Sequence, residues 1–238
     1  IPLRLVGSEM CIRDSLMGFP MAKNLLQKNL DLKIFSRTLE KAKPLGELGG
    51  KIINSLGKTV LDADIIFTML TDDDAVEQVL GDTEFLNNLK PSSTVIDMSS
   101  IKPKIAIKYG KLLKEIKINF LDAPVSGGTI GAEEASLAIM VGGEQKVFDN
   151  VFDVLKIMGN PTLVGPIGSG QISKLANQII VGVTIGAVAE AITLCEKAGV
   201  DANKFIQALS GGFADGKILQ NHGTVSYTHL TLPTNREV

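Results

Sequence analysis

Residues 64–70, DIIFTML, form an apolar run that is bounded by polar residues. A run of this length and composition predicts a strand that is buried on both faces of a sheet. Residues 94–98 (TVIDM) and 119–123 (NFLDA) repeat the pattern further along the chain. Because both faces of such strands must be covered, the three runs favour a parallel sheet between two layers of helices.

Strand-like and helical segments alternate on either side of these runs. We expect further strands at residues 32–35, 51–54, 137–141 and 162–164, and helices at residues 19–28, 39–48, 72–80, 103–117 and 144–158. This alternation predicts an α/β fold with a Rossmann-like, doubly wound parallel sheet. After Gly170 the alternation of strands and helices ends, and we expect a long helix at residues 172–198 and a second helix at residues 201–209. We therefore place a domain boundary near Gly168.

Composition narrows the class of protein. The 238 residues carry 24 Lys+Arg against 26 Asp+Glu, so no net positive charge is available to bind nucleic acid. Two Cys and two His argue against a disulfide framework and against a metal site. The acids at residues 72–74 are interpreted as a helix cap instead of metal ligands. No apolar run reaches the roughly 20 residues of a membrane span, which favours a cytoplasmic protein without a membrane partner.

The two ends of the chain do not fit this fold. Gly18 takes the place of the last glycine of a G-x-G-x-x-G turn, but Arg13 and Ser15 stand where the other two belong. Both ends resemble translated adapter sequence. We interpret residues 1–15 and 225–238 as artefacts, and ordinary divergent termini are the alternative. The expected domains are then residues 1–168, which bind a dinucleotide, and residues 169–224, an incomplete all-helical domain.

The residue that reads the adenosine ribose follows the second strand of a dinucleotide-binding sheet. Here the strand at residues 32–35 is followed by Ser36, Arg37 and Thr38, without an acid. A guanidinium group and two hydroxyls suit a 2′-phosphate, which favours NADP over NAD. A solvated loop arginine is the alternative.

Two other strand ends carry candidate binding groups. Ser99 and Ser100 follow residues 94–98, where their hydroxyls reach a cofactor or cap the next helix. Ser126, Gly127 and Gly128 follow residues 119–123. Successive glycine N–H groups beside a hydroxyl suit a carboxylate, although a simple Gly-Gly turn has the same sequence.

A candidate proton donor opens the long helix. Lys174 and Asn177 are three residues apart and share a helix face. Most helical lysines are solvated, but Lys174 follows a glycine-rich segment at the expected domain boundary. A lysine there can donate a proton to a carbonyl oxygen as hydride reaches the carbon.

Six motifs, taken in order, resemble the β-hydroxyacid dehydrogenase family. They are LMGFPMAKNL (16–25), FTML (67–70), DMSSI (97–101), DAPVSGG (122–128), LAIMVGG (137–143) and GSGQISKLANQ (168–178). The resemblance implies a Rossmann-like NAD(P) domain, a helical second domain, and an enzyme that reversibly oxidises a short β-hydroxyacid. It implies a small-molecule substrate and, in the intact protein, a homo-oligomer.

The resemblance also assigns roles to residues. It implies that Lys174 is the catalytic lysine, that Ser126, Gly127 and Gly128 hold the substrate carboxylate, and that Asn177 orients the substrate. The implied cofactor-binding positions are Met17, Gly18, Ser36, Arg37, Thr38, Leu70, Thr71 and Ser100. Thr71 replaces the family's usual proline.

The implied reaction is the reduction of 2-hydroxy-3-oxopropionate to glycerate, because DMSSI and KLANQ are most similar to that branch. The alternatives are 3-hydroxyisobutyrate, glyoxylate or succinic semialdehyde as substrate. Alternatives from another class are a non-catalytic NADP-binding module and an inactive fragment. Without the first strand, two fingerprint glycines and the later helices, we expect this chain to be poorly stable or inactive.

Overall fold

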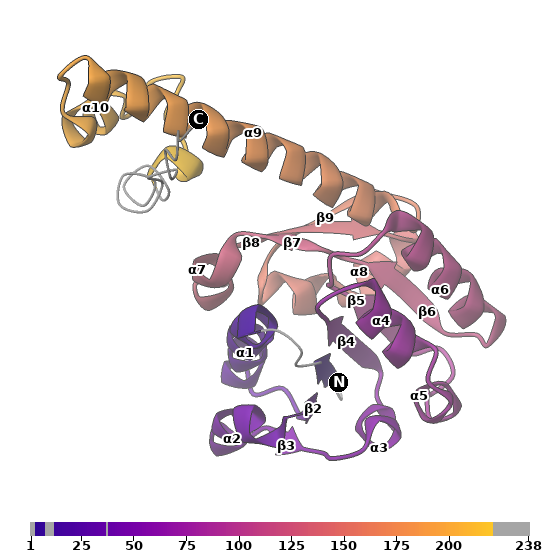
Figure 1. Ribbon diagram of the computed structural model, residues 1–238. Helices are drawn as coiled ribbons and strands as arrows, with labels where there is room; N and C mark the ends of the chain where they lie inside the picture. The colour runs from indigo at the N-terminus through magenta and orange to yellow at the C-terminus, as the bar shows by residue number, and fades with distance from the viewer. Residues whose placement is uncertain (1–2, 8–11, 37, 221–238) are drawn as a thin grey trace, which may run out of the picture. The chain divides into compact units, whose positions relative to one another are not determined.

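The computed structural model describes residues 3–7, 12–36 and 38–220 (Figure 1). The chain divides into two compact units, Ile1–Leu175 and Ala176–Val238. The first unit is an α/β domain and the second is helical, as the sequence predicts. The predicted domain boundary near Gly168 falls one residue before the long helix α9 (Ser169–Lys197), and the first unit includes the opening turns of that helix.

One mixed sheet runs through the first unit. Its described strands are β1 (Leu3–Gly7), β2 (Leu32–Ser36), β3 (Lys51–Ile52), β4 (Ile65–Met69), β5 (Thr94–Asp97), β6 (Asn119–Asp122), β7 (Val125–Ser126), β8 (Leu137–Gly142) and β9 (Gly159–Gly165). The order is β3-β2-β1-β4-β5-β6-β8-β7, and β9 pairs with β8. The pairs from β3 to β6 are all parallel, so the doubly wound parallel sheet is confirmed. A difference is that β8 runs antiparallel to β6 and β7.

The first strand, β1, was not predicted from the sequence. We expected no strand within residues 1–15, yet β1 lies at the centre of the sheet, parallel to β2 on one side and β4 on the other. An extended apolar segment fills that central position because its backbone pairs with both neighbours. Because β1 is present, a missing first strand no longer supports the expectation that this chain is unstable or inactive. Whether residues 1–15 are an artefact stays a prediction.

Helix α1 (Ile12–Gln27) begins seven residues earlier than the sequence predicts. Gly18 therefore lies inside the helix and does not end a turn before it. Arg13 and Ser15 lie in the same helix, which means that the glycine register proposed for residues 13–18 is wrong. The turn between β1 and α1 falls on residues 8–11, outside the described residues.

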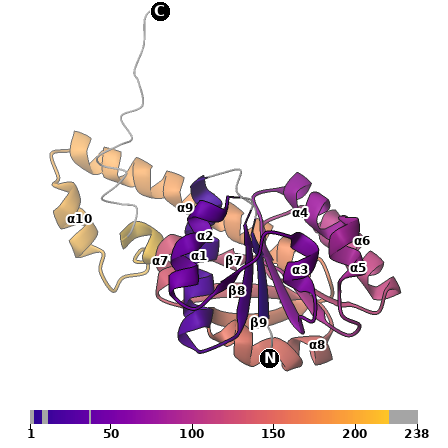
Figure 2. The ribbon, with the colours of Figure 1, turned by 90° about the horizontal axis from the view of Figure 1, so that it is seen from below.

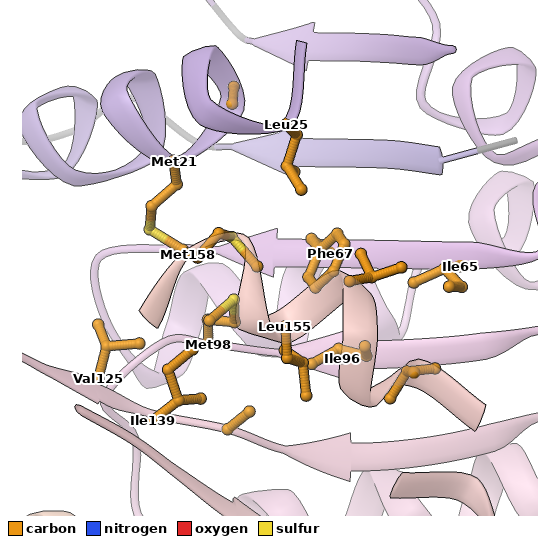
Figure 3. Packing of buried hydrophobic residues seen from close by; sticks show 14 of the residues in the cluster. Met21, Leu25, Ile65, Phe67, Ile96, Met98, Val125, Ile139, Leu155 and Met158 are labelled. Carbon is orange, nitrogen blue, oxygen red and sulfur yellow. The ribbon is translucent and has the colours of Figure 1, made fainter. Parts of the chain in front are cut away.

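Helices cover both faces of the sheet (Figure 2). The remaining helices of the first unit are α2 (Leu39–Glu47), α3 (Leu56–Val60), α4 (Asp73–Leu80), α5 (Thr83–Asn87), α6 (Pro103–Glu115), α7 (Gly128–Glu133) and α8 (Gln145–Lys156). One core packs α1, α2 and α8 against one face, with Met21, Leu25, Phe67 and Leu155 at its centre (Figure 3). The other core packs α3 to α6 against the opposite face, around Phe85 and Tyr109.

The second unit contains most of α9 and helix α10 (Ala202–Ala208). A small core joins them through Ile192, Ile206 and Leu219. By length and composition α9 is apolar enough to cross a membrane, and 11% of its most apolar window is buried. We expected no membrane span because no uninterrupted apolar run reaches about 20 residues, whereas α9 qualifies by a window of 18 residues that tolerates a charge. Length and composition alone do not separate a membrane span from a helix that packs against protein.

Candidate active site

The parallel register brings four strand ends to one edge of the sheet. Gly7 at the end of β1 pairs with Met69 of β4, and Asp97 of β5 pairs with Asp122 of β6. The chain winds from β1 towards β3 in one direction and from β4 towards β6 in the other. A sheet of this kind binds its ligand in the crevice where the strand order reverses. Here that point lies between β1 and β4.

The loop after β4 supplies the first groups at this edge. Leu70 is buried, and its N–H donates to Ser99 Oγ at 2.8 Å. Asp72 accepts from the N–H of Ala75 at 2.9 Å, which confirms that it caps α4. Between them, Thr71 Oγ1 is buried and has no hydrogen-bond partner among the described residues. A buried hydroxyl left unpaired at a cofactor edge fits the approach of a polar ligand.

The loop after β5 is organised around Asp97, which is fully buried. Its Oδ1 accepts from Thr68 Oγ1 at 2.8 Å and from Ser99 Oγ at 2.6 Å. Burial raises the pKa of Asp97 to about 6, and these hydrogen bonds act against the rise. Ser99 is thus a buried structural group that ties Asp97 to Leu70. Ser100, the predicted cofactor contact, is exposed.

The loop after β6 presents the predicted carboxylate-binding groups. Ser126 ends β7 and is half-buried, and Gly127 and Gly128 are exposed. Gly127 has a φ of 143° and Gly128 a φ of 63°, a region that favours glycine. Gly127 is the N-cap of α7 and Gly128 is its first residue, so their N–H groups lie at the end of the helix where backbone donors have no partner within the helix.

Lys174 meets this loop. Its Nζ donates to the carbonyl oxygen of Val125 at 2.7 Å, and the next residue along the loop is Ser126. The lysine is half-buried, and burial lowers its pKa below the ordinary value of 10.5. The structure therefore brings Lys174 together with the predicted carboxylate loop. A lysine whose pKa is lowered gives up its proton more readily near neutral pH.

The contacts of the other predicted site residues say less about their predicted roles. Met17 packs against the core below α1, and a Cβ on Gly18 would meet no atom within 4 Å. Ser36 Oγ donates to the carbonyl of Thr38 at 3.2 Å, and Thr38 is exposed at the N-cap of α2. Arg37 lies outside the described residues. Asn177 belongs to the second unit, where its amide donates to Gln178 Oε1 at 3.1 Å.

Sequence reasoning missed the groups that hold the site's loops. Asp122 and Gln171 are both buried; Asp122 accepts from backbone N–H groups at the start of α9, and Gln171 bonds to the loop after β5. One signal was present, because a carboxylate that ends an apolar strand must find a buried partner. Within the residues that the structure covers, no group of three or more His, Cys, Asp or Glu could hold a metal ion.

Comparisons with known proteins agree with this arrangement. Residues 15–168 match the family model of the NAD binding domain of 6-phosphogluconate dehydrogenase. Residues 168–231 match that of the NAD-binding region of NADP-dependent 3-hydroxyisobutyrate dehydrogenase. With the strand order, these matches define the class: an NAD(P)-dependent oxidoreductase.

Individual relatives narrow the class. The chain is 42% identical over 210 residues to 2-hydroxy-3-oxopropionate reductase of Escherichia coli, covering 87% of this chain and 72% of the relative. It resembles the solved 3-hydroxyisobutyrate dehydrogenase of Mycobacterium tuberculosis with L-serine at a TM-score of 0.82 and 28% identity, over 94% of this chain and 75% of that one. An imine reductase from Myxococcus stipitatus with NADP+ shares the fold at a TM-score of 0.73 and 22% identity, over 96% and 74% of the two chains. The chain belongs to the β-hydroxyacid dehydrogenase family.

The cofactor of this family is a nicotinamide dinucleotide, and the residues present fit it. At the carboxyl edge the strand order reverses between β1 and β4, Thr71 Oγ1 is buried without a hydrogen-bond partner among the described residues, and Ser100 is exposed. The non-catalytic module that the sequence left open is set aside, since this is a family of oxidoreductases.

Proposed function

We propose that this chain reduces a short aldehyde bearing a carboxylate to a β-hydroxyacid, and that its substrate is 2-hydroxy-3-oxopropionate, which yields glycerate. One observation carries the proposal. The Lys174 ammonium lies 2.7 Å from the Val125 carbonyl, directly beside Ser126, Gly127 and Gly128. This contact supports the proposal because it brings the lysine proposed as proton donor to the loop proposed to hold the carboxylate.

Each group has a separate task in the proposed reaction. The N–H groups of Gly127 and Gly128, with the Ser126 hydroxyl, hold the substrate carboxylate. When bound, NADPH would supply the hydride that reduces the aldehyde carbon. Lys174 donates its proton to the aldehyde oxygen as negative charge develops there, and Asn177 keeps the substrate aligned with the lysine. The lysine is half-buried, and this partial burial lowers the pKa of its ammonium group, which favours release of the proton.

The choice of substrate has two supports. The Escherichia coli relative that shares 42% identity is named for 2-hydroxy-3-oxopropionate. The Mycobacterium tuberculosis relative was solved with L-serine, which carries a hydroxyl group on the carbon β to its carboxylate. The aldehyde of 2-hydroxy-3-oxopropionate is also on the β carbon, so both molecules place an oxygen where the proposed roles of the loop and Lys174 need it.

A substrate panel tests this proposal. The chain is assayed with NADPH and 2-hydroxy-3-oxopropionate, glyoxylate or succinic semialdehyde, and in reverse with 3-hydroxyisobutyrate and NADP+. We expect the highest kcat/KM for 2-hydroxy-3-oxopropionate and no turnover of its analogue without a carboxylate, glycolaldehyde. Higher kcat/KM for another member of the panel would move the assignment to that substrate, and turnover of glycolaldehyde would contradict the role of the loop.

We infer three further properties, each from a separate observation. NADPH is preferred over NADH because Ser36 and Thr38 flank Arg37 and no acid follows β2. The protein works in the cytoplasm, since a chain with two cysteines has no disulfide framework to form. It acts as a homo-oligomer, because Ile179, Ile180 and Val183 on α9 are 65–68% exposed. Light scattering measures the molar mass of the protein in solution, and a monomer at micromolar concentration would contradict the proposed homo-oligomer.

A further inference from the structure

The opening turn of α9 is anchored on a buried carboxylate. Asp122 at the end of β6 has no exposed surface. Its Oδ1 accepts from the N–H of Gly168 at 2.7 Å and its Oδ2 from the N–H of Gln171 at 3.0 Å. Burial raises the pKa of Asp122, and these N–H donors oppose the rise. The carboxylate thus occupies the positive end of the helix that carries Lys174.

Two glycines allow the helix to come this close. A Cβ on Gly142 would collide with Asp122 Oδ1. A Cβ on Gly170 would lie 2.6 Å from the Asp122 carbonyl oxygen and 2.8 Å from Oδ2, and would also collide with the carbonyl oxygen of Met140. The glycine-rich segment before Lys174 therefore serves close packing of the helix on β6 and β8.

Gln171 ties the same turn to the loop after β5. Its side chain is 1% exposed. The Nε2 atom donates to the carbonyl oxygen of Ser99 at 2.8 Å, and Oε1 accepts from the N–H of Ile101 at 3.1 Å. One carboxamide thus pairs with the backbone on both sides of Ser100, the exposed residue that is expected to contact the cofactor.

We propose that Asp122 and Gln171 are positioning residues, which hold Lys174 and the Ser100 loop at a set separation. Asp122 fixes the first turn of α9 on the sheet, and Gln171 fixes the Ser100 loop to that turn. Lys174 lies three residues after Gln171 on the same helix, so its reach to Val125 depends on both anchors. This inference rests on the proposed role of Lys174 as the proton donor.

Two substitutions test the anchors. Gln171→Leu has a similar volume and removes both hydrogen bonds of the carboxamide, whereas Gln171→Glu keeps the acceptor for Ile101 N–H. Asp122→Asn keeps one acceptor and removes the charge. We expect kcat to fall at least tenfold in Gln171→Leu and Asp122→Asn with a smaller change in the KM for the aldehyde, since misplacement by about 1 Å has large effects on rate. Gln171→Glu is expected to recover part of the loss at a pH where its buried carboxyl is protonated, since the acid then donates to the Ser99 carbonyl and accepts from the Ile101 N–H; the ionised form has no donor for Ser99 and is expected to give no recovery.

Asp82→Ala is the matched control. Asp82 caps the short helix α5 through the N–H of Phe85 at 2.9 Å, and Phe85 belongs to the other core of the first unit. Alanine removes this cap, which destabilises the fold without touching α9. We expect a lower melting temperature and an unchanged kcat. If Asp82→Ala lowers kcat as much as Gln171→Leu does, the effect is general destabilisation and the proposal fails.

A second readout does not depend on turnover. Trace acetylation of the full chain with acetic anhydride across a pH series, read by mass spectrometry, gives the apparent pKa of each lysine amine. In Gln171→Leu and Asp122→Asn we expect the apparent pKa of Lys174 to rise towards the ordinary lysine value, because the amine gains contact with water. Lys111 on α6 is the internal reference, and we expect no change there. An unaltered Lys174 in folded Gln171→Leu protein overturns the positioning role. Absence of turnover in the unsubstituted chain, with the labelling shift present, overturns only the proposed function.

Discussion

Among single side chains, Asp97 has the most unusual setting. It is fully buried, and its Oδ2 atom has no hydrogen-bond partner within the described part of the chain. Burial raises its pKa from 3.8 to about 6, and the neighbouring carboxylate of Asp122 adds to the rise. The folded state therefore binds this proton more tightly than the unfolded state does. The stabilisation that results is complete below about pH 4 and is lost as the pH rises to about 6.

Asp97→Asn should remove this dependence on pH. Asparagine keeps an acceptor for Thr68 and Ser99 and carries no charge at any pH. We expect the free energy of unfolding of the variant, relative to the unsubstituted chain, to increase between about pH 4 and pH 7 by up to roughly 3 kcal/mol. Urea unfolding at the two pH values measures the difference. A difference that stays constant or decreases with pH would show that Asp97 does not carry the raised pKa.

Among the elements, helix α9 contains glycines in two different packing environments. A Cβ on Gly170 would press on the backbone of β6 and β8, whereas a Cβ on Gly182 would meet no atom within 4 Å. We expect Gly170→Ala to destabilise the fold by about 1–3 kcal/mol through overpacking. Gly182→Ala, the control in the same helix, is expected to stabilise it by about 0.5–1 kcal/mol through lower backbone entropy. Thermal unfolding measures both, and similar effects of the two substitutions would contradict the close docking of the first turn.

Some strands and helices were predicted from the sequence more accurately than others. Strands β4, β5 and β6 were located to within one or two residues, because buried parallel strands are continuous apolar runs. Helices α3 and α5 were missed, since five residues are too few to show a helical period. The start of α1 and the strand β1 were wrong, because both depended on a glycine register that the chain does not have.

Some site residues could be predicted from local sequence, whereas others depend on long-range contacts and could not. Lys174 and the loop at residues 126–128 are local motifs, and the structure brings them together at Val125. Asp122 and Gln171 act through contacts with residues about 45–75 positions away, which no local pattern reports. Asp97 belongs to the same group, because its burial comes from the packing of neighbouring strands.

For the molecule as a whole, cofactor binding should couple to folding. A ligand that binds only the folded state raises its stability, by about 2.7 kcal/mol at a hundredfold excess over Kd. We expect NADPH to raise the melting temperature more than NADH does. In Arg37→Gln the shift with NADPH should decrease to that with NADH, because the guanidinium group that we propose as partner of the 2′-phosphate is gone. Scanning fluorimetry measures the shifts; an undiminished NADPH shift in the variant would assign the 2′-phosphate to other residues.

The central claim is that Lys174 donates the proton in an NADPH-dependent reduction, and Lys174→Ala tests it most directly. Its kcat for 2-hydroxy-3-oxopropionate and its Kd for NADPH are measured beside those of Lys111→Ala, which removes an exposed lysine of α6. We predict that kcat falls by about 10²–10⁴ in Lys174→Ala while the Kd for NADPH changes less than threefold, and that Lys111→Ala matches the unsubstituted chain. Equal losses in kcat and in NADPH affinity, or an unchanged kcat, would contradict the account.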